Sequence, residues 1–179
     1  MRKNDVRDAR GLAITEFTKE PVPYVPRFSD PLYRELSDMS RYYDQQTEDI
    51  KHEKNRVHKL IQFSFPNFTD EIDVDKTSSL EVLRLFPHPD MIEGHTLTEI
   101  MDSILGLGIR GIGQGRAQTL AERLWRAHGI SYPAIESTSF VVKQLQHQGT
   151  NILKMTVERE IVIANMVYVA KALPNSRFS

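Results

Sequence analysis

Apolar side chains recur along this chain at alternating intervals of four and three residues. The first stretch with this spacing, interrupted by two polar residues, comprises Leu32, Leu36, Met39, Tyr43, Gln46, Ile50, Glu53, Val57 and Leu60. This heptad pattern is typical of a helix that packs along another helix. It predicts one long helix over residues 31–66, which Pro66 ends because proline cannot continue a helix.

The same spacing returns later and predicts a second long helix over residues 137–174. Its stripe comprises Val141, Leu145, Gln148, Ile152, Met155, Arg159, Val162, Met166, Val169 and Leu173. A long helix with a narrow apolar stripe is not stable alone, so each stripe needs a partner. We expect an antiparallel coiled-coil hairpin of the two helices, with a dimeric coiled coil as the alternative. Because polar residues interrupt both stripes, we also expect association into a homodimer or higher oligomer through the remaining apolar surface.

The other segments complete a mostly α fold. Residues 67–136 contain three short helical patterns, SSLEVLRLF, TLTEIMDSILG and GRAQTLAERLWRAHG, and form a small helical insert between the long helices. Residues 1–20 are helix-like, residues 21–30 form a proline-rich linker and residues 175–179 are a tail. No segment shows the clear alternation of apolar and polar residues that a half-buried strand has. The sequence therefore predicts a helical protein without a sheet.

Composition narrows the possible functions. The chain has 179 residues, which suits one domain of ordinary size. It has no cysteine, which excludes a disulfide scaffold and a thiolate nucleophile. The net charge is −1, so any binding to nucleic acid must come from local basic patches. No apolar run approaches the ~20 residues that span a bilayer, and no leader pattern is present, so we expect a cytoplasmic protein without membrane contact.

A glycine cluster, GLGIRGIGQGRAQTL, is the first candidate for binding chemistry. Gly106, Gly108 and Gly111 have GxGxxG spacing, but a dinucleotide fingerprint follows a strand, and here a helical pattern precedes it. The run GIGQGRAQTL resembles a helix-hairpin-helix motif, in which a glycine turn leads into a helix whose free amides hold a phosphate. The residues that would do so are Arg110, Gly111, Gly113, Gly115 and Arg116. The alternative is an interhelical turn in which glycine serves only as cap and hinge.

A second basic feature lies in KHEKNRVHKL on the first long helix. Lys51, Asn55 and His58 share one face of that helix. The positive surface is widened by Lys54, Arg56 and Lys59. This surface would bind a nucleic-acid backbone, or it is a solvated face that nearby acids balance.

Two acids near the start of the chain raise the question of a metal site. Asp5 and Asp8 lie three residues apart in KNDVRDARGLA and would share a helix face, so both would reach one Mg²⁺ ion. Two-metal phosphoryl transfer needs further acidic ligands. Acids in a first helical turn are also favoured by the helix dipole alone.

The stretch KNDVRDARGLA resembles the end of the RuvC-like catalytic domain in the DEDD transposases of bacterial insertion sequences, which recombine DNA under the guidance of a bridge RNA. There a KxDxxDAxxxA helix carries the last two of four metal-binding acids, so the resemblance implies a catalytic, Mg²⁺-binding role for Asp5 and Asp8. Residues 30–68 are similar to the family's long helix, with its NRxHKLxxxxFP ending. A short insert and a second long helix follow in the family's order.

The resemblance does not extend to the family's whole catalytic machinery. Its first two acids lie upstream of the DxxD helix, and its nucleophilic serine lies in a later domain that Ser176 and Ser179 precede. We therefore expect a transposase fragment with DNA and guide RNA as partners, inactive alone and without a stably bound metal. Two alternatives are a free-standing helical nucleic-acid-binding protein that uses the glycine turn, and a structural coiled-coil partner.

Overall fold

The computed structural model describes residues 31–173, and the predicted segments 1–20, 21–30 and 175–179 lie outside the described residues. The described chain consists of six α-helices and one short 3₁₀ turn, without a strand in that range, which confirms the predicted mostly α composition. The elements are α2 (Pro31–Ser64), α3 (Phe68–Glu71), α4 (Thr77–Leu85), η1 (Pro89–Met91), α5 (Leu97–Gly106), α6 (Gln114–Ile130) and α7 (Phe140–Ala172).

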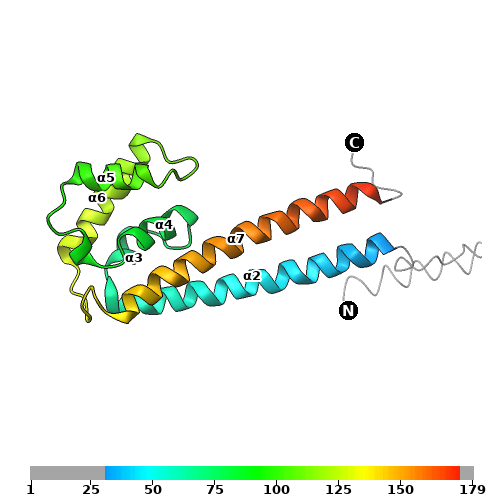
Figure 1. The fold of residues 1–179 in the computed structure, drawn as a ribbon, viewed down its shortest axis with the longest axis horizontal. Helices are drawn as coiled ribbons and strands as arrows, with labels where there is room; N and C mark the ends of the chain where they lie inside the picture. Colours follow the sequence, from blue (N-terminus) through cyan, green and yellow to red (C-terminus); the bar gives the residue numbers. More distant parts are fainter. Residues whose placement is uncertain (1–30, 174–179) are drawn as a thin grey trace, which may run out of the picture.

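The two long helices, α2 and α7, pack side by side and run in opposite directions (Figure 1). We call this pair the shaft. The short helices α3 to α6 gather at the end where α2 finishes and α7 begins, and form the head (Figure 1). α7 begins at Phe140, three residues after the predicted start at 137, because the Ser139 side chain caps it by accepting a hydrogen bond from the Val141 amide at 3.3 Å.

Side chains at all positions of both predicted stripes are buried or partly buried. Ile50 and Val57 of α2 and Ile152 of α7 are at most 5% exposed. The polar interruptions are accommodated within this contact: the Arg159 guanidinium lies over the Tyr43 ring, 5.8 Å from its centroid. The contact between α2 and α7 thus follows the sequence pattern, while supercoiling of the pair stays a prediction.

One hydrophobic core joins the shaft to the head. Phe65, just after α2, and Phe68 of α3 are fully buried and meet edge to face, with ring centroids 5.4 Å apart. α4 packs against α7, and α6 packs against α3 and α5. α4 lies against α7 at Gly149, where an added Cβ would be at an ordinary contact distance of 3.9 Å from the Leu80 carbonyl oxygen. The head is therefore fixed to the shaft.

A capping box fixes the start of α5, the helix that leads into the glycine turn. The Thr96 amide and hydroxyl donate to the Glu99 carboxylate at 2.7 and 2.9 Å, and the Glu99 amide donates back to the Thr96 hydroxyl at 3.3 Å. The two hydrogen bonds that its carboxylate accepts from Thr96, the one from the amide foremost, hold the pKa of Glu99 below its ordinary value.

The lowered pKa leads to a prediction for Glu99→Gln. A carboxylate whose pKa is lower in the folded than in the unfolded state stabilises the fold above the unfolded pKa, and that contribution disappears as the pH falls through the folded pKa. We expect the variant to melt at a lower temperature than the native chain at neutral pH, and the two melting temperatures to converge in acid. Thermal melts followed by circular dichroism across this pH range would check it. A constant difference at all pH values would contradict the assignment.

Candidate nucleic-acid interface

The glycine turn connects α5 to α6. Gly108 and Gly111 have φ angles of 62° and 80°, in the left-handed region that glycine adopts without strain. Gly113, the N-cap of α6, has a φ of −94°, and a Cβ at Gly113 or Gly115 would meet no atom within 4 Å. Neither backbone conformation nor packing requires glycine at those two positions. Their effect is to leave the first turn of α6 uncovered.

A hollow of about 490 Å³ opens beside this turn. We call it the basic hollow. Its lining residues come from the loop before α4 with the start of α4, from the glycine turn and from α6: Lys76, Ser78, Arg110, Ile112, Arg116, Thr119, Leu120 and Arg123. Four of them are cationic and none is acidic. Cations from three separate segments thus converge on one concave surface.

The cationic side chains of the basic hollow differ in the groups that they contact within the protein. Arg116 Nη1 donates to the Gly111 carbonyl at 2.9 Å, which ties α6 to the glycine turn. Lys76 Nζ lies 3.3 Å from the Asp73 carboxylate. The pKa of Asp73 is lowered, first because the Asp75 amide donates to its carboxylate and then because Lys76 is close. Among residues 31–173, no carboxylate lies within ion-pair distance of Arg110 or Arg116, so both retain their charge for a ligand.

Part of the basic hollow follows from the sequence and part does not. Arg110 and Arg116 were predicted binding residues, and the structure brings them together with Gly111 between them in the turn. Lys76 and Arg123 were missed. Arg123 follows Arg116 by seven residues, two helical turns, so the face they share was available as a signal. Lys76 gives no such signal, because only packing of the head brings its loop beside α6.

A second hollow, of about 370 Å³, lies where the basic face of α2 meets α7 and the loop before α4. We call it the shaft hollow. Its lining residues are Thr47, Ile50, Lys51, Lys54, Asn55, His58, Asp75 and Arg159. The structure therefore places four of the residues named from KHEKNRVHKL around one hollow. The other two, Arg56 and Lys59, are not among its lining residues, and Arg56 pairs with Glu53.

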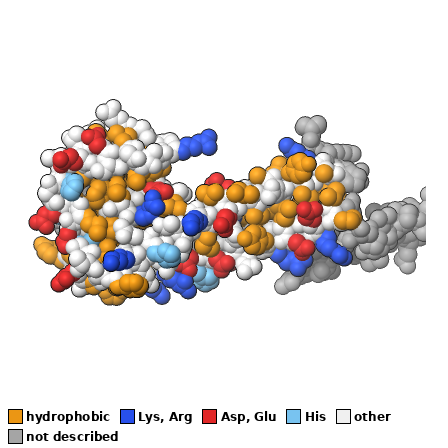
Figure 2. All heavy atoms as spheres, in the orientation of Figure 1, with side chains coloured by type: hydrophobic (Ala, Val, Ile, Leu, Met, Phe, Trp, Pro, Cys, Tyr) orange, Lys and Arg blue, Asp and Glu red, His pale blue; other side chains and the backbone are white. Residues whose placement is uncertain are grey.

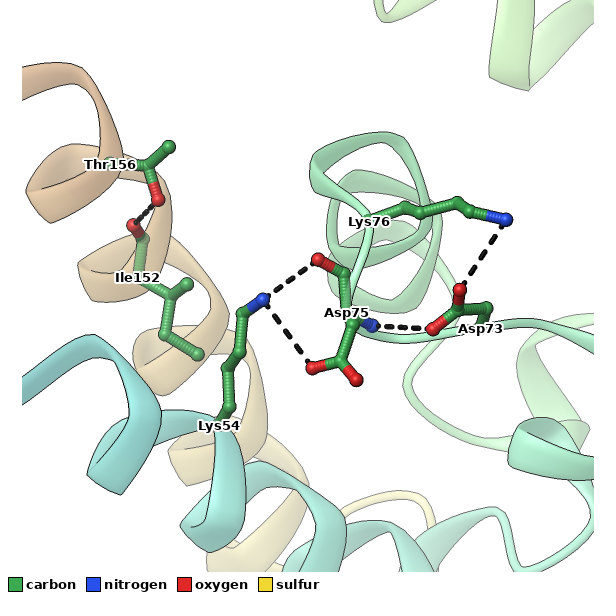
Figure 3. Close-up of polar contacts among 6 residues, drawn as sticks. All are labelled: Lys54, Asp73, Asp75, Lys76, Ile152 and Thr156. Carbon is green, nitrogen blue, oxygen red and sulfur yellow. Dashed lines mark hydrogen bonds and ion pairs between the residues drawn. The ribbon is translucent and has the colours of Figure 1, made fainter. Parts of the chain in front are cut away.

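Lys54 has a structural partner in this hollow. Its ammonium donates to the Asp75 carbonyl at 2.8 Å and lies 3.4 Å from the Asp75 carboxylate, so it links α2 to the loop before α4 (Figure 3). Lys51 pairs with Glu48 at 3.5 Å. Because Glu48 and Asp75 compensate the charges of these two lysines, the shaft hollow offers less free positive charge than the basic hollow.

The predicted metal ligands Asp5 and Asp8 lie outside the described residues. Between residues 31 and 173, no group of three or more histidine, aspartate or glutamate side chains is arranged to hold a metal ion. Over the same residues, none of the helices combines the length and apolar character of a membrane span.

Comparison with known proteins found no match to a family model, to a curated protein or to a solved structure. The features of this chain that bear on its function are therefore the two hollows and the motifs of the sequence.

Proposed function

We propose that this chain is the linker and coiled-coil region of a DEDD-type, RNA-guided transposase, and that its head binds the phosphate backbone of nucleic acid. The observation that carries the binding role is the basic hollow, where four cations converge without an acid in the lining. Like charges held together repel one another, and an anion in the hollow offsets that repulsion. A chain with a net charge of −1 has no general excess of cations to explain the cluster.

The chemistry of the hollow suits a phosphodiester. A guanidinium presents a planar fork of donors that matches phosphate oxygens, and the hollow contains three arginines. The uncovered first turn of α6 adds backbone amides and the positive end of a helix dipole. These groups recognise a backbone and not a base edge, so the binding is independent of sequence.

The transposase assignment is supported by the arrangement of its motifs. In NRxHKLxxxxFP, Asn55 and His58 line the shaft hollow, Phe65 is fully buried, and Pro66 follows the end of α2. The order of long helix, short helices and long helix is also the one that the resemblance implies. We propose that α2 and α7 form the coiled coil, and that Asp5 and Asp8 contribute two Mg²⁺ ligands to an active site that needs further acids. A free-standing nucleic-acid-binding protein is the second candidate, and the basic hollow favours it equally.

The experiment that tests the binding role uses fluorescence anisotropy with short labelled DNA and RNA duplexes of two unrelated sequences. At low salt we expect weak binding, with the two sequences bound equally well, because phosphate contacts carry no sequence information. A chain that binds none of these duplexes at low salt would have only a structural role.

We also propose that the chain forms a homodimer. The end of the shaft that lies away from the head provides a surface for it. An apolar hollow of about 280 Å³ lies there, lined by Leu36, Tyr43, Ile163, Met166, Val167 and Ala170. Figure 2 shows hydrophobic side chains gathered on the visible face of this end. Two residues that line the hollow, Ile163 and Val167, are 42% and 49% exposed. We expect sedimentation velocity at tens of micromolar to show dimers, and Ile163→Glu to shift them to monomers. A native chain that sediments strictly as a monomer would contradict this.

A further inference from the structure

A second apolar surface runs along the outside of the shaft. Val157, Ile161, Ala164 and Tyr168 follow one another on α7 at intervals of four, three and four residues. All four are exposed, Val157 and Ile161 by more than half and Tyr168 by 78%. We call them the outer stripe. Residues two positions apart lie about 200° apart around a helix, so Ile161 is nearly opposite Arg159, which belongs to the heptad stripe that faces α2. The outer stripe therefore lies on the side of α7 away from α2.

The spacing of the outer stripe indicates what kind of partner it takes. Alternating steps of four and three residues place side chains in one narrow row, which is the surface that packs against another helix. A row of this kind in water is unfavourable, and soluble proteins rarely leave one uncovered. The partner is therefore an amphipathic helix.

We propose that the outer stripe is covered by residues 3–19 of the same chain, docked as a helix. Val6, Ala9, Ala13 and Phe17 recur at intervals of three, four and four residues, so on a helix they form one apolar face. That face is as long as the outer stripe, since each spans eleven residue steps. Its two alanines are small and permit the helix to approach α7 closely. In this arrangement no second molecule is needed to cover this side of α7.

The connection to α2 brings this segment within reach. Leu36, near the start of α2, lines the same apolar hollow as Ala170, near the end of α7, so the chain enters the shaft at the end where the outer stripe finishes with Tyr168. The eleven residues 20–30 contain three prolines and span up to about 34 Å at ~3.1 Å per residue in an extended proline-rich conformation. The outer stripe itself extends for only about 17 Å at 1.5 Å per residue.

Charged residues of both signs border the outer stripe, among them the exposed Glu158, Glu160 and Lys154. In the N-terminal segment, Arg7 and Arg10 lie on one side of the apolar face, where a docked helix can pair them with the glutamates of α7. Asp8 lies about 200° from Val6 around such a helix and would point away from the shaft, whereas Asp5 lies about 100° from Val6, at the edge of the apolar face. This last consequence rests on the proposed function, in which those acids join further ligands.

The absence of cysteine from the chain permits a direct test by crosslinking. Ala13→Cys with Ala164→Cys places one thiol on each apolar surface, and a short bismaleimide should join them within one chain, giving a crosslinked product of monomer mass. Asp8→Cys with Ala164→Cys is the matched control, with its first thiol on the opposite helix face, and should crosslink several-fold less. Equal yields for the two pairs, or no product from either, would overturn the proposal. Crosslinked dimers whose yield grows with concentration would show that a second copy occupies the outer stripe instead.

The crosslinking yield depends on which residues of the two helices face each other, whereas the rate of thiol labelling does not. In the full chain with Ala164→Cys alone, a monofunctional maleimide should react several-fold faster once Phe17→Glu is added, because the covering helix is released. The melt of the α2–α7 shaft should stay cooperative in both variants. An unchanged labelling rate would contradict the proposal, whatever the outcome of the nucleic-acid binding experiments.

Discussion

Replacing Leu145 by aspartate is expected to abolish the cooperative thermal transition of this protein. Leu145 is 1% exposed and belongs to the core that joins α7 to α2 and the head. Removing a buried leucine costs about 2–5 kcal/mol, and an unpaired carboxylate in the same place costs several more. Because domains of this size are stable by only about 5–15 kcal/mol, the sum removes most or all of the stability. Far-ultraviolet circular dichroism during heating measures the effect.

Two companion variants make the result specific. Leu145→Ala should keep a cooperative but lower transition, since it leaves a cavity without a buried charge. Lys143→Asp changes an exposed position near the start of the same helix and should melt like the native chain or slightly higher, because acids are favoured in a first helical turn. If Leu145→Asp melted within a few degrees of the native chain, the packing of α7 described above would be wrong.

The double substitution Arg110→Glu with Arg116→Glu is expected to reduce nucleic-acid affinity at least about tenfold at low salt, because it replaces two phosphate-binding charges by two repulsive ones. Lys143→Glu with Lys154→Glu on the exposed face of α7 makes the same change in net charge outside the hollow. That control should bind within a few-fold of the native chain. Equal losses in the two double variants would mean that overall charge, and not the basic hollow, governs binding.

Gly113→Val tests the uncovered start of α6 without disturbing the fold. A side chain at Gly113 meets no atom within 4 Å and the backbone there has a negative φ, so the melting temperature should stay near the native value. Affinity should nevertheless fall, because the valine would lie between the ligand and the first amides of α6. Gly111 is unsuitable for this purpose, because its φ of 80° would strain any other residue.

The heptad pattern predicted the long helices well because both of its determinants are local. Side-chain spacing decides which face is apolar, a capping serine marks where a helix begins and a proline marks where one ends. α2 ends at Ser64, two residues before the predicted end at 66, since a residue before proline is driven out of the helical conformation. Placing the ends within a few residues therefore required no knowledge of the tertiary structure.

The candidate site was only partly predictable because it is assembled by tertiary packing. Lys76 reaches the basic hollow through the fold of the head, which no periodicity encodes. Lys54 was predicted to widen the positive surface around Lys51, yet it is bound to Asp75, a residue 21 positions later. The glycines of the turn also looked alike, and only their φ angles separate Gly111, which the backbone requires, from Gly113, which it does not.

The salt dependence of duplex binding tests the central claim, phosphate binding in the basic hollow, most directly. The logarithm of the binding constant falls linearly with the logarithm of salt concentration, by about 0.9 per DNA phosphate neutralised. We expect a steep slope for the native chain and a slope shallower by about two in the Arg110→Glu, Arg116→Glu variant. The same slope in both proteins would show that the bound phosphates lie elsewhere and would contradict the claim.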